Sequence, residues 1–461
     1  MQRIIILFTL FFQCTCVYSN TEIFGSVEKS KSEWVYLYEI DDFLTRSETL
    51  VQKFKTNSQG RFYFNVDHHQ TKRYVIRINN TFTELYLQPD SEYKIIIPSE
   101  SIEVIPYFSG REIELLFIDL DTNDINYKIL GFEAWLDDEM ADLYLLKDAD
   151  PTKFIDGVLK FKVDVFKTYK EDTSSFFVNH IKYVLGKTID NIKYFGSPSE
   201  AEKFDFYIKG QKIQYQLPAY FDYFKDYYQG VAQKLNPTAK KIISKGLSNG
   251  NASQLAQGLM TDSLIPNLQI AELVGLLIIA EEYPKANISQ NQLISITKFL
   301  EKNSGFEENK IIARNLSKKF FTLVSGDALP PIPLNKDSDL GKRGSFQYVH
   351  FFDPDNPKSL AESRALKSLY EKYGSQIDFV SICLDSRLED ETFKDRVLKN
   401  IEWPVYSLPY HHPIWKVLNI GTFPYYILID PTLIIQSIPA LGPTPNGLYK
   451  TIAKTFFDIV K

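Results

Sequence analysis

The stretch that decides the fold of the C-terminal part reads Phe351-Phe352-Asp353-Pro354-Asp355-Asn356-Pro357-Lys358-Ser359. The residues before it, from Phe346 onward, form an apolar run that is typical of a buried strand. The Asp-Pro-Asp-Asn segment is typical of a tight turn, and a helix is expected at 359–373. A further apolar run at 379–385 predicts a second strand, and a second helix is expected at 389–399. This order indicates an α/β layer with partly parallel strands from residue 326 onward.

A second motif strengthens this interpretation. Gly421-Thr422-Phe423-Pro424 leads into an apolar run that ends at Asp430. The order of the elements and the Gly-Thr-x-Pro motif resemble the thioredoxin-like domain of TlpA-type envelope reductases. The resemblance implies that Pro424 is that family's cis-proline, which lies beside the active turn.

The turn itself departs from the family. Its usual sequence is Trp-Cys-x-x-Cys, with a proline after the first cysteine. Asn356 and Ser359 fall on the two cysteine positions, whereas Pro357 keeps the family's proline and Lys358 follows it. Dithiol exchange requires one thiolate that attacks and a second thiol that resolves the mixed disulfide. An amide and a hydroxyl can do neither, so we expect the scaffold without its redox chemistry.

One thiol is left outside the N-terminal leader. Cys383 lies in the middle of the predicted strand 379–385, where a buried and inert thiol is the ordinary outcome. An alternative stays open, in which the protein is related to thiol-disulfide oxidoreductases and acts as an enzyme through Cys383 or through a non-redox ligand groove.

Such a groove would lie beside Pro424. The backbone of Thr422 and Phe423 could pair there with an extended partner segment, and Phe352, Phe423 and Tyr425 could add apolar contacts. In the competing interpretation, Pro424 only shapes the start of the strand.

The first nineteen residues predict a secretory signal peptide. Arg3 supplies the positive charge, residues 4–12 the apolar run, and Val17-Tyr18-Ser19 the cleavage site that leaves Asn20 first. A lipid anchor on Cys14 or Cys16 is disfavoured, because Gln13 and Thr15 precede them. We expect no transmembrane segment in the mature chain, and a periplasmic or outer-membrane-associated location in a bacterial envelope.

Two further domains are expected. Five short alternating runs within residues 20–105 predict a β-sandwich; they are Trp34–Tyr38, Arg61–Val66, Tyr74–Ile78, Leu85–Leu87 and Tyr93–Ile97. The Gly60-Arg61-Phe62-Tyr63-Phe64 motif also resembles β-domains that precede TlpA-like modules. Residues 106–325 predict a helical domain, with helix starts at Asp150-Pro151, Ser197-Pro198-Ser199-Glu200 and Asn236-Pro237, where a polar residue precedes proline, and a last helix over 311–323. Apolar spacing in Phe154-Ile155-Val158-Leu159-Phe161 and in Ile270-Leu273-Val274-Leu277-Ile278 favours buried helical faces.

Other chemistry finds little support. Asp353 and Asp355 read as turn residues and Asp385 and Asp430 as strand ends, whereas His68-His69 and His411-His412 read as surface loops and His350 as a strand residue. No set reaches the ligand number of a structural metal site, so neither metal nor cofactor is expected. The net charge of −6 and the lack of a basic run disfavour nucleic acid. The sequence thus predicts a multidomain α+β protein that binds or scaffolds an envelope protein or peptide segment.

Overall fold

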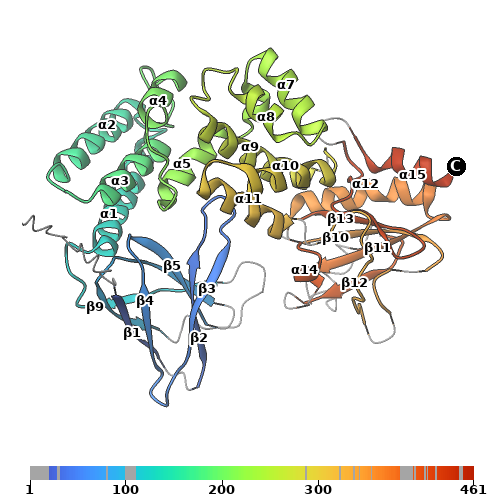
Figure 1. Ribbon diagram of the computed structural model, residues 1–461, viewed down its shortest axis with the longest axis horizontal. Coiled ribbons are helices and arrows are strands. Elements are labelled where there is room, and N and C mark those ends of the chain that lie inside the picture. The colour runs from blue at the N-terminus through green and yellow to red at the C-terminus, as the bar shows by residue number, and fades with distance from the viewer. Residues whose placement is uncertain are drawn as a thin grey trace, which may run out of the picture. The chain divides into compact units, whose positions relative to one another are not determined.

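A computed structural model describes residues 20–28, 32–78, 81–98, 111–285, 288–320, 323–335, 338–341, 343–354, 356–384, 398, 401–409, 412, 414–420, 423–445 and 450–461 (Figure 1). They fall into two compact units. One lies within Met1–Glu39, Leu50–Ile102 and Glu112–Gly131, and the other within Ile40–Thr49, Glu103–Arg111 and Phe132–Lys461. The predicted signal peptide and the lipid-anchor positions lie outside the described residues.

Two sheets form the first unit and share one core. One sheet has the order β4-β1-β7-β9 and the other β3-β2-β5-β6-β8. The strands are β1 Asn20–Val27, β2 Trp34–Ile40, β3 Glu48–Lys55, β4 Arg61–Asp67, β5 Lys72–Ile78, β6 Thr81–Leu87, β7 Glu92–Ile97, β8 Arg111–Glu112 and β9 Leu116–Ile118. Alternate residues such as Ile23, Phe64 and Tyr74 point into the shared core. Two layers of alternating strands are what the sequence predicted for this region.

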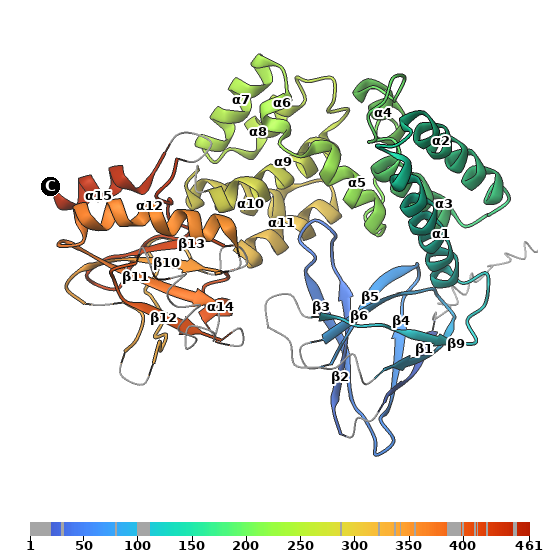
Figure 2. The ribbon, with the colours of Figure 1, turned by 180° about the vertical axis from the view of Figure 1, so that it is seen from behind.

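Within the described residues, eleven α-helices follow in the sequence, with the first residues of α1 in the first unit and the rest in the second (Figure 2). They are α1 Ile125–Leu146, α2 Pro151–Thr168, α3 Ser175–Thr188, α4 Glu200–Tyr207, α5 Pro218–Tyr228, α6 Val231–Lys234, α7 Pro237–Ser248, α8 Ala252–Leu259, α9 Leu268–Glu282, α10 Gln290–Asn303 and α11 Glu307–Phe320. Asp150 and Asn236 cap α2 and α7 directly before a proline, as predicted. In the start predicted within 197–200, the cap is Ser199 and not the serine before the proline, because Ser199 and Glu202 form a capping box.

One predicted helical face is wrong in part. Phe154, Val158 and Phe161 of α2 are buried, but Leu159 is 40% exposed and Ile155 is only half-buried. The apolar arc of α2 is wider than the arc that its neighbours cover. In α9 the predicted residues are all buried, because that helix has an apolar circumference.

The C-terminal sheet has the order β12-β11-β10-β13-β14. Its elements are β10 Phe346–Phe352, α12 Pro357–Tyr373, β11 Ile377–Leu384, β12 Val405–Leu408, α14 Ile414–Val417, β13 Tyr425–Ile429, β14 Ile435–Ser437 and α15 Ile452–Val460. β11 runs parallel to β10 and β12, whereas β13 is antiparallel to β10. A parallel strand-helix-strand unit is therefore followed by an antiparallel pair and a last helix.

The two faces of this sheet carry separate cores. Tyr348 and Tyr426 pack with Leu366 of α12 and Phe456 of α15, so both helices cover one face (Figure 1). Val349 and Ile427 pack with Trp415 on the other face. The helix predicted at 389–399 falls almost wholly outside the described residues. Within the described chain, no helix has the length and apolar character needed to cross a membrane.

Candidate functional site

Asn356 caps the helix that follows the turn. Its Oδ1 accepts hydrogen bonds from the backbone N–H groups of Lys358 (2.9 Å) and Ser359 (3.3 Å). An asparagine at this position satisfies N–H groups that the helix cannot pair internally. Pro357 takes the first helical position, where the absence of an N–H group costs nothing. The helix thus begins two residues before the predicted start at Ser359.

The same asparagine also reaches the strand that carries the cis-proline. The Phe423–Pro424 peptide bond is cis, in agreement with the expectation for Pro424. Nδ2 of Asn356 donates a hydrogen bond to the backbone carbonyl of Phe423 at 3.3 Å. One backbone group of the predicted peptide groove is therefore already engaged within the chain. Thr422, which was expected to supply another, lies outside the described residues.

The side chains predicted to line this groove have different environments. Phe352 is fully buried and packs with Cys383, and Tyr425 is 6% exposed and belongs to the core around Trp415. Phe423 is half-buried, with its ring 6.0 Å from that of Trp415. Of the three aromatic residues, Phe423 alone keeps surface that a ligand could contact.

Neither position of the turn presents a nucleophile to solvent. Ser359 is fully buried, and its Oγ accepts a hydrogen bond from the backbone N–H of Asp353 at 3.4 Å. Cys383 is also fully buried, in the strand β11 where the sequence placed it. A buried thiol is shielded from reagents and from protein substrates. Asp353 is half-buried in the turn, and Asp355 lies outside the described residues.

A buried histidine lies in β10 next to the turn. His350 is 1% exposed, and its ring stacks between those of Phe352 and Tyr426 at centroid distances of 5.1 and 5.2 Å. Its Nδ1 lies 3.1 Å from Ser381 Oγ, which also accepts a hydrogen bond from Trp403 Nε1 at 2.8 Å. Burial lowers the pKa of His350 to about 3, so the ring is neutral at ordinary pH.

A buried carboxylate completes this polar region, and sequence reasoning missed it. Glu362 on α12 is 7% exposed and accepts hydrogen bonds from Tyr426 Oη (2.5 Å) and Thr444 Oγ1 (2.8 Å). Burial, together with the neighbouring Tyr348 and Glu362, holds the pKa of Tyr426 well above its usual range. The available signal was an acidic residue one turn after Ser359, on the face of the predicted helix that meets the sheet.

The remaining predicted residues are structural where they are described. His68 is 5% exposed, so its assignment to a surface loop is wrong; its ring contacts the carbonyl of Gln70 (2.8 Å) and the hydroxyl of Thr21 (3.0 Å). His69 is exposed, and His412 Nδ1 accepts a hydrogen bond from the N–H of Ile414. Asp430 accepts bonds from the following turn. His411 and Asp385 lie outside the described residues, which contain no cluster of three metal-ligating side chains.

The strand-helix-strand unit, the antiparallel pair after a cis-proline and the final helix together define a thioredoxin-like fold for the C-terminal part. No protein-family model and no curated protein matches the chain. Solved structures are similar to a minor part of it. The thioredoxin domain of a thiol-disulfide oxidoreductase from Bacteroides vulgatus is 20% identical, covers 30% of this chain and 99% of its own, and has a TM-score of 0.23.

Two other solved structures resemble the same kind of fold. A thiol:disulfide interchange protein from Bacteroides sp. is 21% identical and covers 26% of this chain and 85% of its own, with a TM-score of 0.23. An uncharacterized thioredoxin-like protein from Bacteroides vulgatus is 19% identical and covers 30% and 86%, with a TM-score of 0.24. At these identities and scores the likeness assigns neither an activity nor a ligand to this chain.

Proposed function

We propose that this protein is a redox-inactive binding or scaffold protein of the bacterial cell envelope, and that its thioredoxin-like module serves as an interaction surface. The observation that carries the proposal is the role of Asn356. Its side chain caps α12 through Oδ1 and ties the turn to Phe423 through Nδ2. A residue at the first cysteine position that makes three structural hydrogen bonds holds the turn in place, and its amide is not a nucleophile that can attack a disulfide.

The proposal includes an organisation and an address. A signal peptide at 1–19 precedes a β-sandwich domain at 20–105, a helical domain at 106–325 and the thioredoxin-like domain at 326–461. The mature protein is periplasmic or associated with the outer membrane, and its partner is an envelope protein or peptide segment. The apolar leader with Arg3 supports the address. The alternative of thiol chemistry through Cys383 gains no support from a thiol that is fully buried.

Insulin reduction tests the lack of redox activity. We expect no turnover by the natural protein, and no labelling of Cys383 by a thiol reagent until the protein unfolds. The variant Asn356→Cys/Ser359→Cys places two thiols at the start of α12, where the helix N-terminus favours the thiolate. That variant should gain activity, whereas the matched control Asn356→Ala/Ser359→Ala should not. Turnover by the natural protein that disappears in Cys383→Ala would instead establish the enzymatic alternative.

Partner capture tests the binding role. Gentle crosslinking in the native envelope, followed by purification through a C-terminal tag, should recover a partner in near-equal amount. Lys358 is exposed in the first turn of α12, and Phe423, whose carbonyl accepts a hydrogen bond from Asn356, is half-buried. Lys358→Glu with Phe423→Ala should therefore reduce recovery, while exchange of the exposed Lys209 of the helical region for Glu should not. A partner that is retained unchanged by the turn variant would refute the interaction surface proposed here.

A further inference from the structure

α2 carries an apolar stripe that no other element of the described chain covers. Leu159, Val163 and Phe166 are 40%, 65% and 46% exposed, and Ile155 continues the stripe at half burial. At 1.5 Å per residue the stripe is about 16 Å long. It lies beside the buried residues of the same helix, and α2 forms the outer edge of the helices α1 to α4 in both views (Figures 1 and 2). An apolar surface of this kind is typical of an interface.

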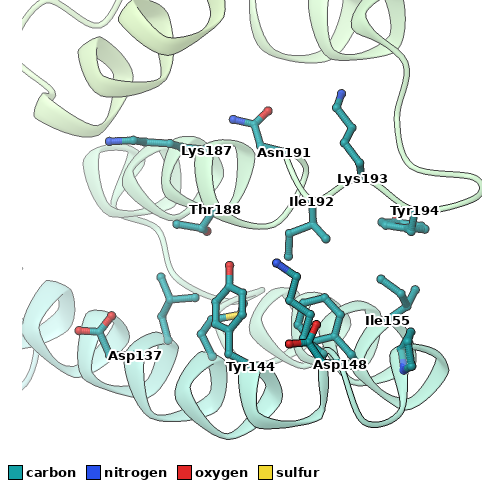
Figure 3. A pocket seen from close by; sticks show the side chains of 15 residues that line it. Asp137, Tyr144, Asp148, Ile155, Lys187, Thr188, Asn191, Ile192, Lys193 and Tyr194 are labelled. Atoms are coloured by element: carbon teal, nitrogen blue, oxygen red, sulfur yellow. The ribbon is translucent and has the colours of Figure 1, made fainter.

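The stripe leads into a pocket at its N-terminal end. Ile155 lines both, and the pocket has a volume of about 940 Å³ between α1, α2 and the end of α3. Its floor includes the buried side chains of Leu136, Met140 and Phe154. In Figure 3 the hydroxyl of Tyr144 points across it toward the end of α3, where Thr188 lies. The pocket therefore offers space for a large side chain at the end of an apolar track.

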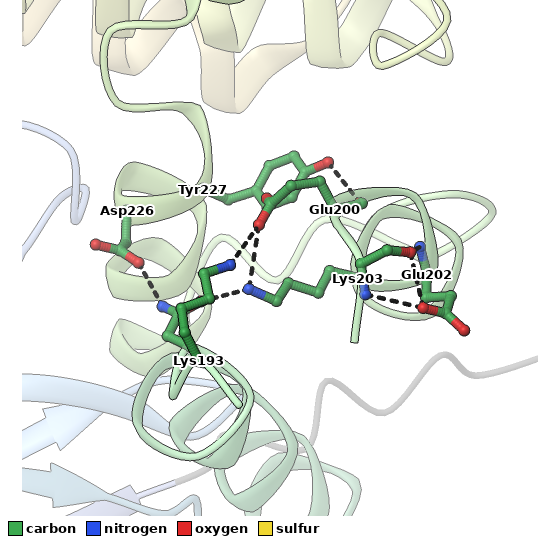
Figure 4. Close-up of polar contacts among 8 residues, drawn as sticks. Lys193, Glu200, Glu202, Lys203, Asp226 and Tyr227 are labelled. Atoms are coloured by element: carbon green, nitrogen blue, oxygen red, sulfur yellow. Dashed lines mark hydrogen bonds and ion pairs between the residues drawn. The ribbon is translucent and has the colours of Figure 1, made fainter. Parts of the chain in front are cut away.

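The wall of the pocket opposite α2 is formed by the end of α3 and the residues that follow it. Polar contacts on the side away from the pocket hold this segment. Lys203, whose side chain is only 2% exposed, donates to Asn191 Oδ1 at 2.9 Å and pairs with Glu200 at 3.3 Å. Lys193 also pairs with Glu200, at 3.2 Å (Figure 4). Asp226 accepts a hydrogen bond from Asn191 Nδ2 at 2.7 Å. These contacts fix the segment that lines the pocket, so its shape is preformed.

A row of charges runs alongside the stripe and alternates in sign. It contains Lys153, Asp156, Lys160, Asp164 and Lys167. Lys153 pairs with the capping residue, and Lys160 pairs with Asp164 at 3.0 Å. Asp156 and Lys167 make no ion pair within the described chain. The two uncompensated charges of the row thus have opposite sign and lie near opposite ends of the stripe.

We propose that α2 pairs with α2 of a second copy of this chain, antiparallel and around a twofold axis that crosses the stripe at the level of position 161 along the helix. Such an axis exchanges Ile155 with Phe166 and Leu159 with Val163, because the midpoint of each pair falls within one residue of position 161. Every residue of the stripe then meets another residue of the stripe. Phe166 of each copy lies beside Ile155 of the other and fills the pocket there.

The same axis makes the charges complementary. In an antiparallel helix pair, equivalent flanks face each other, so Asp156 of one copy lies opposite Lys167 of the other, and this pair occurs twice. A twofold interface requires a surface that is complementary to itself, and a mixed row of charges satisfies that requirement. An anionic membrane would instead select cations alone, whereas Asp156 lies beside the stripe and Asp137 and Asp148 line the pocket. This inference is independent of the function proposed above.

Sedimentation equilibrium of the purified full chain at about 1–100 μM tests the proposal. We expect a dimer in reversible equilibrium with the monomer. Val163→Glu should give a monomer throughout, because it places a charge at the centre of the apolar contact. Val178→Glu is the matched control, since Val178 is 44% exposed on α3 and lies outside the stripe. A natural protein that stays monomeric, or a dimer that Val163→Glu leaves intact, would overturn the proposal.

A charge exchange tests the register. Asp156→Lys and Lys167→Asp should each weaken the dimer about tenfold, because each brings like charges together twice. The combined variant should return the dissociation constant to within about threefold of the natural value. The two positions are three turns apart on one helix, so recovery cannot come from a contact within a chain. If the dissociation constant of the combined variant were raised by the product of the two single effects, this antiparallel arrangement would be refuted.

Discussion

Acid should weaken the C-terminal sheet through His350, which is buried between two aromatic rings. Its Nε2 has no hydrogen-bond partner within the described chain, and burial lowers its pKa from 6.5 to about 3. The unfolded chain therefore binds a proton below pH 6.5 that the folded chain does not bind until about pH 3. The contribution of His350 to the free energy of unfolding is therefore fully present above pH 6.5, and it is lost as the pH falls from 6.5 toward 3.

The size of the effect follows from the two pKa values. Each pH unit between the two pKa values lowers the free energy of unfolding by about 1.36 kcal/mol. Since pH 5 is about 1.5 units below the unfolded pKa, the loss at pH 5 should be about 2 kcal/mol. The matched control is His350→Phe, which does not titrate and keeps an aromatic ring between Phe352 and Tyr426. Ser381 then still accepts its hydrogen bond from Trp403. Other titrating groups are the same in both proteins, so they cancel in the comparison.

Urea denaturation at pH 7 and pH 5 measures the difference. Trp403 and Trp415 are 5% and 2% exposed in this part of the chain and report its unfolding by fluorescence. Trp34 and Trp135 are replaced by Phe in both proteins to remove the other signals. Between the two pH values the natural histidine should cost about 2 kcal/mol more than phenylalanine. An equal pH dependence of the two proteins would refute the assignment of a neutral, buried His350.

Four further changes test local features. Asn356→Ala should lower the free energy of unfolding of the C-terminal sheet by about 1–2 kcal/mol in urea, because it removes a helix cap; an unchanged value would contradict the capping role. Gly25→Ala should destabilise the sandwich by about 1–3 kcal/mol, because the new Cβ would lie 2.0 Å from the Phe62 ring. Gly131→Ala in α1 should instead stabilise the protein by about 0.5–1 kcal/mol in thermal unfolding, because a Cβ at this position meets nothing within 4 Å. Destabilisation by this variant would contradict the finding that the space around Gly131 is open. Lys203→Met should lower the stability of the helical region by about 0.5–1.5 kcal/mol, because it removes the hydrogen bond to half-buried Asn191 and one of the two lysine partners of the exposed Glu200. Intact stability would show that these contacts in Figure 4 are dispensable.

The parts of the fold that sequence patterns predicted are those with an unambiguous period or apolar run. β10 and β11 are largely apolar and almost wholly buried, because both faces of the sheet are covered. β3 gave no such pattern, since Glu48–Lys55 is exposed or half-buried on both faces. In α2 the pattern indicated an apolar arc correctly, but spacing alone does not say which half of a wide arc meets a neighbour.

The candidate site shows the same division. The turn, the cis-proline and the buried thiol lie where motif positions put them, because each is encoded by adjacent residues. The hydrogen bond from Asn356 to Phe423 joins residues 67 positions apart, and no local pattern carries such a contact. Glu362 is likewise explained only by Tyr426 and Thr444, which reach it from distant segments.

At position 356, an asparagine that holds the turn takes the place of a cysteine that could carry out thiol chemistry, and this exchange can be tested. The Oδ1 of Asn356 accepts a hydrogen bond from the start of α12, and its Nδ2 donates one to the carbonyl of Phe423 before the cis-proline. A cysteine at position 356 would remove both of these side-chain hydrogen bonds. Cysteine restoration should therefore create activity and loosen this junction together. If Asn356→Cys/Ser359→Cys gained insulin reduction without faster amide exchange at Lys358, the asparagine would not be holding the turn, and the argument for an interaction surface built on it would fail.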